Sequence, residues 1–495
     1  MLLAELLTGI EKVVNATGTY QNREVEITGI TCDSRAVEPG FLFAALPGLT
    51  VDGREFIGEA VAGGAVAILA PEGTVLKDNA QRLSLITDRN PRQCYAKMAS
   101  AFHGELPECI AAITGTNGKT SVADFTKQIW AGLGLDAGSA GTLGISATIK
   151  DSEIEYPGNL TTPDPTDLHK VMAELARKGV DHMAIEASSH GLDQYRLDGF
   201  KFQIAAFTNL SRDHLDYHEN LSSYFEAKLR LFEDLLMPDG TAILNADVPE
   251  FSRIKNLVEK RGCRVISFGR NGADITLNSC ALHDQGQRVS ITLDGKNTEF
   301  DLPLIGDFQV ENVLCALGIV MASGIDAREA VKILPTLNGV RGRLEHAGTL
   351  PNGAAVYVDF AHTADAIESV LKTMRSHVSG RLIVLFGCGG DRDPGKRIEM
   401  GRAASENADV VILSDDNPRS EDPASIRAQA LQGCPGALEI GDRATAIARG
   451  VSMLEPGDLF VVAGKGHEQG QIIGDKILPF DDVDVVRAAI AEMGS

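Results

Sequence analysis

Short apolar runs that end in glycine-rich turns and lead into helical patterns recur through most of this chain. From about Ile110 onward, β-branched runs of this kind alternate with segments of helical spacing. The alternation is typical of βαβ units, which build parallel sheets covered by helices. Glycine supplies 51 of the 495 residues, above the usual ~7%, as many tight turns or phosphate-binding loops would require. The sequence therefore predicts an α/β protein.

The length of 495 residues predicts about three domains at roughly 150 residues each. Residues 1–91 are expected to form a small α/β domain, residues 92–340 a central parallel-sheet domain resembling P-loop ATPases, and residues 341–495 a Rossmann-like doubly wound domain. Helices are predicted at 1–14, 56–70 and 222–236. Strands are predicted at 110–114, 183–186, 203–208, 241–245, 356–362, 382–387, 410–414 and 459–464, and residues 263–305 alternate in strand fashion.

Charge and composition exclude several classes of partner. The chain carries 46 basic and 68 acidic residues, a net charge of −22, which disfavours binding to nucleic acid and to anionic membranes. Its longest uncharged apolar stretch, Asn312 to Ile325, is shorter than the roughly 20 residues that span a bilayer. The first residues show no basic signal-peptide region, so cytoplasmic residence is expected. The eight cysteines include no C-x-x-C pair, which argues against a zinc site or a disulfide framework.

The sharpest local signal is TGTNGKTS at 114–121, between an apolar strand and a helical pattern. Backbone amides and a helix N-terminus in such a loop hold phosphate oxygens, Lys119 offsets their charge, and the Thr120 hydroxyl can bind Mg²⁺. The segment departs from the general G-x-x-x-x-G-K-[ST] pattern because position 113 is isoleucine. The phosphate-binding residues predicted here are Gly115, Thr116, Asn117, Gly118, Lys119, Thr120 and Ser121.

Polar clusters follow the next strands of the central domain. Glu186 ends the strand at 183–186, where ligands bind in α/β sheets, and is a candidate Mg²⁺ ligand, although a lone glutamate there more often faces solvent or caps a helix. Residues 207–219 concentrate histidines and carboxylates, including His214, which indicates either metal or phosphate contact or a capped helix start. Lys228 lies in a mixed helical stretch, and its surroundings alone predict a surface lysine.

Three polar loops are predicted at strand ends of the C-terminal domain, at 386–397, 414–419 and 463–468. The first resembles a second anion-binding turn, with Arg392, Lys396 and Arg397 nearby. Each loop alone could be a simple turn. Together they mix carboxylates with guanidinium groups in one crevice, which favours a zwitterionic ligand such as an amino acid.

Taken in order, TGTNGKT, EASSHGL, FTNLSRDHLDYH, DFAHTADA, GCGGDRD, DDNPR and AGKGHE resemble the Mur ligases of peptidoglycan synthesis over essentially the whole chain. The resemblance implies an ATP-dependent amide ligase that joins meso-diaminopimelate to UDP-N-acetylmuramoyl-L-alanyl-D-glutamate through an acyl phosphate, with Mg²⁺ as cofactor. It implies that the N-terminal domain holds the uridine nucleotide, the central domain ATP and the C-terminal domain the amino acid. A monomer is expected.

The resemblance also assigns individual residues. It implies catalytic roles for Lys119, His214 and Lys228, with Lys228 carried as a carbamate, and metal contacts for Thr120, Glu186, His214 and that carbamate. Further nucleotide contacts are implied for Asn312, Arg343 and Asp359. The UDP-substrate positions are Cys32, Ser34, Leu49, Thr50, Val51, Thr161, Thr162, Ser188, Gln194 and Arg196. The amino-acid positions are Arg392, Asp416, Asn417, Pro418, Arg419, Gly464 and Glu468.

Three alternatives remain open at this point. The same ligase could use L-lysine, and Arg419 bears on that choice because a cation suits the extra carboxylate of diaminopimelate. A folylpolyglutamate synthase-like ligase is disfavoured by the DNPR loop and by the N-terminal domain. A nucleotide switch of the GTPase type would need an N-K-x-D motif, and the sequence contains none.

Overall fold

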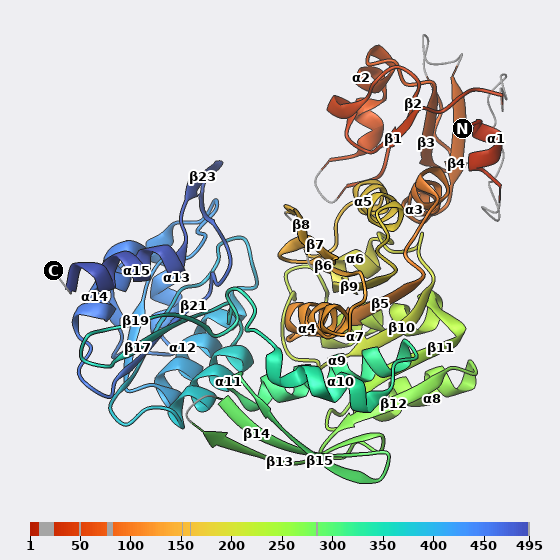
Figure 1. Cartoon of the computed structure of the whole chain (residues 1–495). Coiled ribbons are helices and arrows are strands. Elements are labelled where there is room, and N and C mark those ends of the chain that lie inside the picture. Colours follow the sequence, from red (N-terminus) through yellow and green to blue (C-terminus); the bar gives the residue numbers. More distant parts are fainter. Residues whose placement is uncertain are drawn as a thin grey trace.

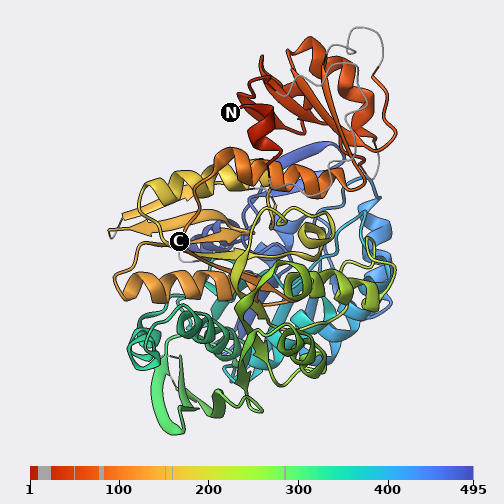
Figure 2. The same ribbon diagram turned by 90° about the vertical axis from the view of Figure 1, so that its right-hand side faces the viewer.

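The computed structural model describes residues 1–8, 24–48, 51–76, 83–150, 152–158, 160–283 and 286–493. Figure 1 shows an N-terminal, a central and a C-terminal region, with the C-terminal region beside the central one. The view turned by 90° likewise places the N-terminal region at one end of the molecule (Figure 2).

The N-terminal region is built on a four-stranded parallel sheet in the order β1–β2–β3–β4. Its elements are α1 (Leu3–Leu6), β1 (Gly29–Thr31), β2 (Phe41–Ala44), α2 (Ile57–Ala62), β3 (Ala67–Pro71) and β4 (Ser84–Asp88), and α3 (Pro91–His103) follows at the boundary with the central region. Helix α3 packs Cys94, Tyr95 and Met98 into the core of this sheet. It also contacts α5 (Pro165–Arg177) of the central region and so joins the two regions.

Two predicted helices of this region differ from the structure. The prediction of one helix across 56–70 is wrong, because the segment is a helix only over α2 and then becomes strand β3. The break falls at Gly63 and Gly64, where Gly64 has φ +99°, a left-handed conformation that ends the helix. The prediction over 1–14 is borne out only at α1, and residues 9–23 lie outside the described residues.

The central region holds an eleven-stranded sheet in the order β15-β14-β13-β12-β11-β10-β5-β9-β6-β7-β8. In this order, each strand from β13 to β6 is parallel to its neighbour. Antiparallel strands extend the sheet at both edges. The strands are β5 (Cys109–Thr114), β6 (Ala137–Gly141), β7 (Gly144–Ile149), β8 (Ser152–Tyr156), β9 (His182–Glu186), β10 (Phe202–Phe207), β11 (Leu236–Asn245), β12 (Arg264–Gly269), β13 (Ile275–His283), β14 (Gly286–Leu293) and β15 (Lys296–Leu302). All four strands predicted for this domain are confirmed.

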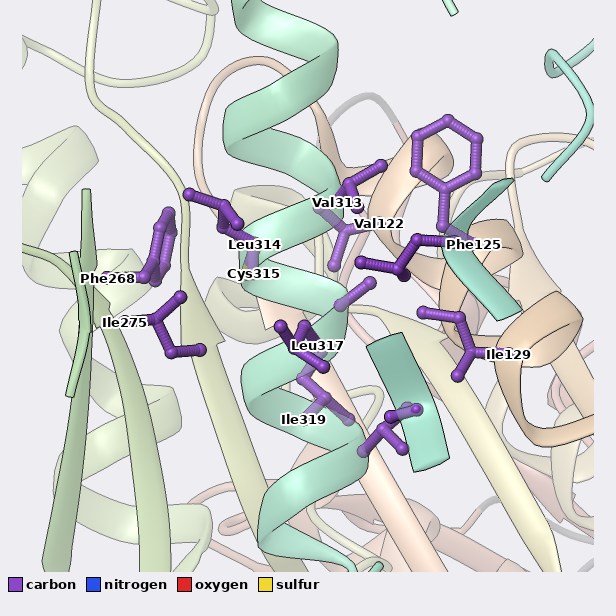
Figure 3. Close-up of a cluster of buried hydrophobic side chains, with 14 of the residues drawn as sticks. Val122, Phe125, Ile129, Phe268, Ile275, Val313, Leu314, Cys315, Leu317 and Ile319 are labelled. Atoms are coloured by element: carbon purple, nitrogen blue, oxygen red, sulfur yellow. The ribbon is translucent and has the colours of Figure 1, made fainter. Parts of the chain in front are cut away.

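The helices of the central region cover both faces of its sheet. They are α4 (Lys119–Gly132), α5, α6 (Ser189–Asp193), α7 (Leu221–Arg230), α8 (Phe251–Lys260), α9 (Asp307–Ala322) and α10 (Ala327–Ile333), and one π-helical turn at Leu231–Leu235 follows α7. The apolar stretch noted in the sequence lies mostly in α9. Figure 3 shows α9 between Val122 and Phe125 of α4 on one side and Phe268 and Ile275 on the other. Its apolar character on all sides therefore serves a buried position.

The C-terminal region holds a six-stranded sheet in the order β16-β17-β21-β18-β19-β20, parallel except for the edge strand β16. Its strands are β16 (Glu345–Thr349), β17 (Ala355–Asp359), β18 (Leu382–Phe386), β19 (Val410–Leu413), β20 (Leu438–Glu439) and β21 (Leu459–Ala463), and the hairpin β22 (Gly470–Ile473) and β23 (Lys476–Pro479) stands apart from it. Helices α11 (Ala364–Arg375), α12 (Gly395–Asn407) and α13 (Pro423–Leu431) pack on one face, and α14 (Arg443–Ser452) and α15 (Asp482–Met493) on the other. The doubly wound prediction is confirmed.

Among the described residues, no helix is long and apolar enough to cross a membrane. All eight cysteines are described and are free thiols, with Cys32 exposed.

Candidate active site

The loop at 115–118 joins the carboxyl end of β5 to the N-terminus of α4, as predicted for a phosphate cradle. Gly115 and Gly118 have φ of +144° and +89°. A Cβ at Gly115 would collide with Thr208, and one at Gly118 would collide with Asn312. Both positions therefore require glycine, for backbone conformation and for space. No side chain caps the start of α4, so its first amide groups remain available to a ligand.

Two lysines converge on this loop. Lys119 Nζ donates to the carbonyl oxygens of Gly115 at 3.0 Å and Thr116 at 2.8 Å. Lys228 Nζ donates to the same Gly115 oxygen at 2.8 Å and lies 4.3 Å from the centre of the Tyr224 ring. Burial, and then the charge of Lys119, hold the pKa of Lys228 well below its usual range. The prediction of a surface lysine at 228 is wrong, because α7 turns this side chain inward and leaves it 1% exposed.

The C-terminal region reaches the same loop through Arg343. Its Nη2 donates to Thr120 Oγ1 at 3.0 Å, and its guanidinium lies 4.4 Å from the centre of the Phe360 ring. Asp359 is buried and accepts hydrogen bonds from the amides of Leu344 and Ala361, both at 2.7 Å. Burial raises the pKa of Asp359, and the positive charge of Arg343 opposes that rise.

Glu186 lies at the end of β9, 1% exposed, and accepts hydrogen bonds from the amide and hydroxyl of Thr142 at 2.8 and 3.2 Å. The hydroxyl oxygens of Thr142 and Thr161 lie 3.1 Å apart. His214 adopts a left-handed backbone, with φ +54°, beside the buried Asp213. Burial lowers the pKa of His214 to about 3, although Asp213 opposes the shift.

A connected polar cluster holds four of the predicted substrate residues. Thr162 and Ser188 share a hydrogen bond of 2.9 Å between their hydroxyls. Arg196 donates to the carbonyl of Thr162 and to Gln194 Oε1, both at 2.7 Å. The cluster starts at the N-terminus of α6, where Ser188 caps the helix. The structure therefore brings together Thr162, Ser188, Gln194 and Arg196.

The predicted uridine-binding residues lie apart from this cluster, in the N-terminal region. Cys32 Sγ lies 3.4 Å from Asp164 Oδ2 of the central region, and Ser34 Oγ donates to Glu59 at 2.8 Å. Val51 is exposed. Leu49 and Thr50 lie outside the described residues.

The amino-acid positions gather at the carboxyl ends of β18, β19 and β21. Asn417 Nδ2 donates to Glu468 Oε2 at 2.9 Å, and Asn417 Oδ1 accepts from Lys465 Nζ at 3.0 Å. Lys465 is fully buried and also pairs with Glu468 at 3.0 Å. Arg419 Nη1 donates to the carbonyl of Gly390 at 2.8 Å. Asp416 is buried, Gly464 faces it with φ +113°, and Pro418 precedes Arg419 in the same loop.

The turn at 386–397 differs from the predicted second anion-binding turn. The amide of Gly395, at the start of α12, donates to Asp393 Oδ1 at 2.8 Å, so the helix N-terminus already has a carboxylate. Arg397 is 1% exposed and bonds both carboxylate oxygens of Glu421, at 3.0 and 2.8 Å. Lys396 lies 3.6 Å from Asp213. Of the three predicted cations, only Arg392 lines the large cavity of about 1570 Å³ between the central and C-terminal regions, the cleft.

Two cavities connect these groups. One, of about 860 Å³, is lined by the phosphate loop, Glu186, His214, Asn312, Arg343 and Asp359. The other, of about 1570 Å³, is lined by Thr162, Ser188, Arg196, Arg392, Asn417, Arg419 and Glu468. Thr161, His214 and Phe360 line both, so the cavities adjoin.

The prediction of individual site residues missed two groups that join these parts. Lys465 holds both Asn417 and Glu468, and its place inside AGKGHE was the available signal. Arg212 pairs with Asp393 at 3.1 Å and Glu399 at 2.8 Å across the boundary between the central and C-terminal regions. No local pattern reveals that contact, because its partners lie more than 180 positions along the chain.

Comparison with known proteins gives consistent results for all three regions. Residues 26–113 match the model described as Mur ligase family, catalytic domain, residues 113–320 match the Mur ligase middle domain, and residues 342–466 match the Mur ligase, glutamate ligase domain. The UDP-N-acetylmuramoyl-L-alanyl-D-glutamate–2,6-diaminopimelate ligase of Brucella melitensis is 50% identical over 94% of this chain and 95% of its own length. The enzyme of the same name from Agrobacterium fabrum is 49% identical over 95% and 94%.

Solved structures agree with the sequence matches. A solved structure of a UDP-N-acetylmuramoyl-L-alanyl-D-glutamate–2,6-diaminopimelate ligase is 32% identical and superposes with a TM-score of 0.69, covering 100% of this chain and 99% of that one. MurF ligase from Thermotoga maritima, solved in complex with ADP, shares the fold at 17% identity, with a TM-score of 0.63 and coverage of 95% and 97%. The fold and the matched domains define an ATP-dependent ligase that forms amide bonds. The chain belongs to the Mur ligase family.

Proposed function

We propose that this ligase joins meso-diaminopimelate to UDP-N-acetylmuramoyl-L-alanyl-D-glutamate at the expense of ATP, a step of peptidoglycan precursor synthesis. The observation that carries the proposal is the pair of adjoining cavities. One presents the phosphate loop, and the other presents Arg392, Arg419 and Glu468 from the C-terminal region. Relatives that are about 50% identical over nearly their whole length carry the name of this activity.

The chemistry explains why two cavities must adjoin. An ionised carboxylate is a poor electrophile, so the D-glutamate carboxylate first takes the γ-phosphoryl group of ATP, becomes an acyl phosphate and releases ADP. The neutral amine of the amino acid then attacks the acyl carbon, so the amide C–N bond forms, the C–O bond to phosphate breaks, and phosphate and the amine proton leave. Lys119 and the free amides of α4 would stabilise charge on the transferring phosphoryl group. Attack requires the reacting atoms to lie within about 3–3.5 Å, so the acyl phosphate and the amine must meet where the two cavities adjoin, beside His214 and Phe360.

In this proposal the nucleotide occupies the cavity of about 860 Å³. The residues assigned to it are Gly115, Thr116, Asn117, Gly118, Lys119, Thr120, Ser121, Asn312, Arg343 and Asp359. All ten line that cavity except Gly115, whose carbonyl instead accepts hydrogen bonds from Lys119 and Lys228. Arg343 and Asp359 come from the C-terminal region, so a bound nucleotide would contact both regions.

Mg²⁺ fits the donor set of this cavity. No group of three histidine, cysteine or carboxylate side chains suited to a metal occurs within the described ranges. Mg²⁺ is commonly bound through one or two carboxylates together with substrate phosphates, and Glu186 with the Thr120 hydroxyl offers that arrangement beside the phosphate loop. His214 lines the same cavity. When bound, the ion would offset phosphate charge and polarise the phosphoryl group.

We assign Lys228 as a carbamate, formed when its neutral amine adds CO₂ and releases one proton. Its burial supports the assignment, because an uncompensated ammonium beside Lys119 is costly whereas a carbamate anion would be paired. The carbamate would add an anionic oxygen ligand for Mg²⁺. Incubation with ¹³CO₂ should give a protein carbamate signal in ¹³C NMR that Lys228→Ala removes. A signal that survives the substitution would overturn the assignment.

The remaining assignments follow the two other regions. We place the uridine nucleotide against Cys32, Ser34, Leu49, Thr50 and Val51, and the dipeptide against Thr161, Thr162, Ser188, Gln194 and Arg196. Diaminopimelate is assigned to Arg392, Asp416, Asn417, Pro418, Arg419, Gly464 and Glu468. The corresponding domain limits are 1–91, 92–340 and 341–495, and the enzyme is proposed to act as a cytoplasmic monomer.

Phosphate release tests the proposed function. Purified enzyme with ATP and Mg²⁺ should release phosphate only when both the UDP-dipeptide and an amino acid are present, and the UDP-tripeptide should appear in equal amount. L-lysine in place of diaminopimelate tests the nearest alternative substrate. Rapid phosphate release with ATP alone would contradict ligase chemistry and favour a nucleotide switch.

A further inference from the structure

The hairpin β22–β23 contacts the loop at 416–419 instead of extending the C-terminal sheet. The strands of the hairpin pair only with each other, and an isolated parallel bridge links Ile473 to Arg419. Figure 1 shows β23 projecting from the C-terminal region. Most of the hairpin is exposed, so burial of its own side chains does not explain its position.

Four hydrogen bonds join residues 471–474 of the hairpin to residues 416–419. Gln471 Nε2 donates to the carbonyl of Asp416 at 2.7 Å, and the amide of Ile472 donates to Asn417 Oδ1 at 2.9 Å. The amide of Arg419 donates to the carbonyl of Ile472 at 3.1 Å, and the amide of Gly474 donates to the carbonyl of Arg419 at 2.8 Å. Arg419 is thus held on both sides of its α-carbon.

The backbone of Arg419, which these hydrogen bonds hold, is strained. Arg419 has φ +51°, the left-handed conformation that costs a side chain-bearing residue on the order of 1 kcal/mol or more. Such a conformation persists when its surroundings fix it. The guanidinium end is fixed as well, since Nη1 donates to the carbonyl of Gly390 at 2.8 Å. Both ends of the Arg419 side chain are therefore placed before any ligand arrives.

We propose that the hairpin positions Arg419 for selection of the amino acid, and that Gln471 is the side chain through which it does so. Gln471 does not line the cleft, and its amide nitrogen bonds a backbone carbonyl of the loop. It is therefore a positioning residue. The inference rests on the proposed function, because it takes Arg419 to pair with the carboxylate that distinguishes diaminopimelate from lysine.

The mechanism is one of pre-organisation. A guanidinium already aimed at the carboxylate loses little rotational freedom on binding, so the bidentate pair forms at low entropic cost. Releasing the 416–419 loop would let Arg419 sample other orientations. Affinity for diaminopimelate would then fall, whereas ATP bound at the phosphate loop would not sense the change.

Gln471→Met tests this proposal, because it keeps the side-chain length and removes the N–H donor. We expect KM for diaminopimelate to rise about 5- to 10-fold, as for loss of roughly one hydrogen bond, with kcat and KM for ATP changed by less than about 2-fold. Lys476→Ala, at an exposed residue of the same hairpin, is the matched control and should match wild type.

Arg419→Ala supplies the second arm. If Gln471 acts through Arg419, Gln471→Met should change KM for diaminopimelate by less than about 2-fold in the Arg419→Ala background, because coupled residues are not additive. Equal effects of Gln471→Met in both backgrounds, or a wild-type KM in the single variant, would overturn the proposal. Failure of wild type to use diaminopimelate would instead refute the proposed function, so the two failures are distinct.

Discussion

Two glycine-rich turns of this protein, 114–121 and 386–397, look alike in sequence and differ in structure. Both follow a buried parallel strand, contain a lysine and precede a helix. In the first turn no side chain caps the helix, and Lys119 bonds only backbone carbonyls. In the second, Asp393 occupies the first amide of α12, and Glu421 pairs with Arg397.

The difference teaches that glycine and cations alone do not make an anion site. What decides is whether the amides and cations already have anionic partners within the fold. In the first turn the amides of Thr116 and Asn117 bond Asn209. The first amides of α4 and the charge of Lys119, however, have no anionic partner within hydrogen-bond distance among the described residues and are left to a ligand. In the second turn most of these groups are bonded within the fold, and only Arg392 lines the cleft.

The largest effect should come from a substitution in the first turn, 114–121. Lys119→Ala is expected to lower kcat/KM by at least about 10³-fold, because a cation facing phosphates in a desolvated loop contributes several kcal/mol to the transition state. Lys332→Ala, at an exposed lysine of α10 that lines neither cavity, is the control and should stay within about 2-fold of wild type. Steady-state kinetics with a circular dichroism check of folding measures both. A folded Lys119→Ala variant with near-normal turnover would remove the phosphate-loop assignment.

Arg419→Ala should have the next largest effect, and it tests which amino acid the cleft beside the second turn selects. Losing one partner of a desolvated charged pair costs about 2–5 kcal/mol. We expect kcat/KM for diaminopimelate to fall by the corresponding factor, and kcat/KM for lysine to change much less. Side-by-side kinetics with the two amino acids measures the difference. Equal weakening of both would show that Arg419 serves their shared α-carboxylate.

Arg397→Ala tests whether a cation of the second turn stabilises the fold instead of binding a ligand. Removing this buried guanidinium should lower the free energy of unfolding by about 2–3 kcal/mol, less than for a fully buried pair because Glu421 is one-third exposed. Arg392→Ala should leave stability within about 0.5 kcal/mol and raise KM for the amino acid. Urea denaturation compares the two variants. The comparison between the turns fails if Arg397→Ala is as stable as Arg392→Ala.

The smallest effect should come from Asp393→Ala. Loss of this carboxylate removes the cap at the start of α12 and the ion pair with the partly exposed Arg212, and should cost about 1–2 kcal/mol of stability. It should also free the amide of Gly395, so sulfate should stabilise the variant more than wild type. Thermal unfolding with and without sulfate measures this gain. Equal gains in both proteins would mean that Asp393 does not block an anion site.

The sequence predicts best where the structure depends on neighbours along the chain. The phosphate loop is local, so its strand, glycines and helix could be placed from residues 109–132 alone. The central and C-terminal strands were likewise predicted, because each reads as an apolar run between turns. The segment at 56–70 was not, since an alanine- and valine-rich stretch suits a helix and a buried strand equally.

Long-range partners account for what sequence patterns could not reveal. Lys228 reads as a surface lysine until α7 brings it to Gly115, 113 positions earlier. Its special role was expected only through the family resemblance. The second turn was misread because Glu421 and Asp213, which neutralise Arg397 and Lys396, come from other loops. The hydrogen bonds between the hairpin and Arg419 depend on how the hairpin aligns with the 416–419 loop, which no local sequence pattern specifies.

The ratio of kcat/KM for meso-diaminopimelate to that for L-lysine, measured on the wild-type enzyme with ATP, Mg²⁺ and the UDP-dipeptide, tests the central claim most directly. A site built to bind a charged carboxylate can reject the analogue that lacks it by roughly 10⁴-fold, and we expect a preference for diaminopimelate approaching that size. A ratio near one, or a preference for lysine, would contradict the assignment of Arg419 and of the substrate.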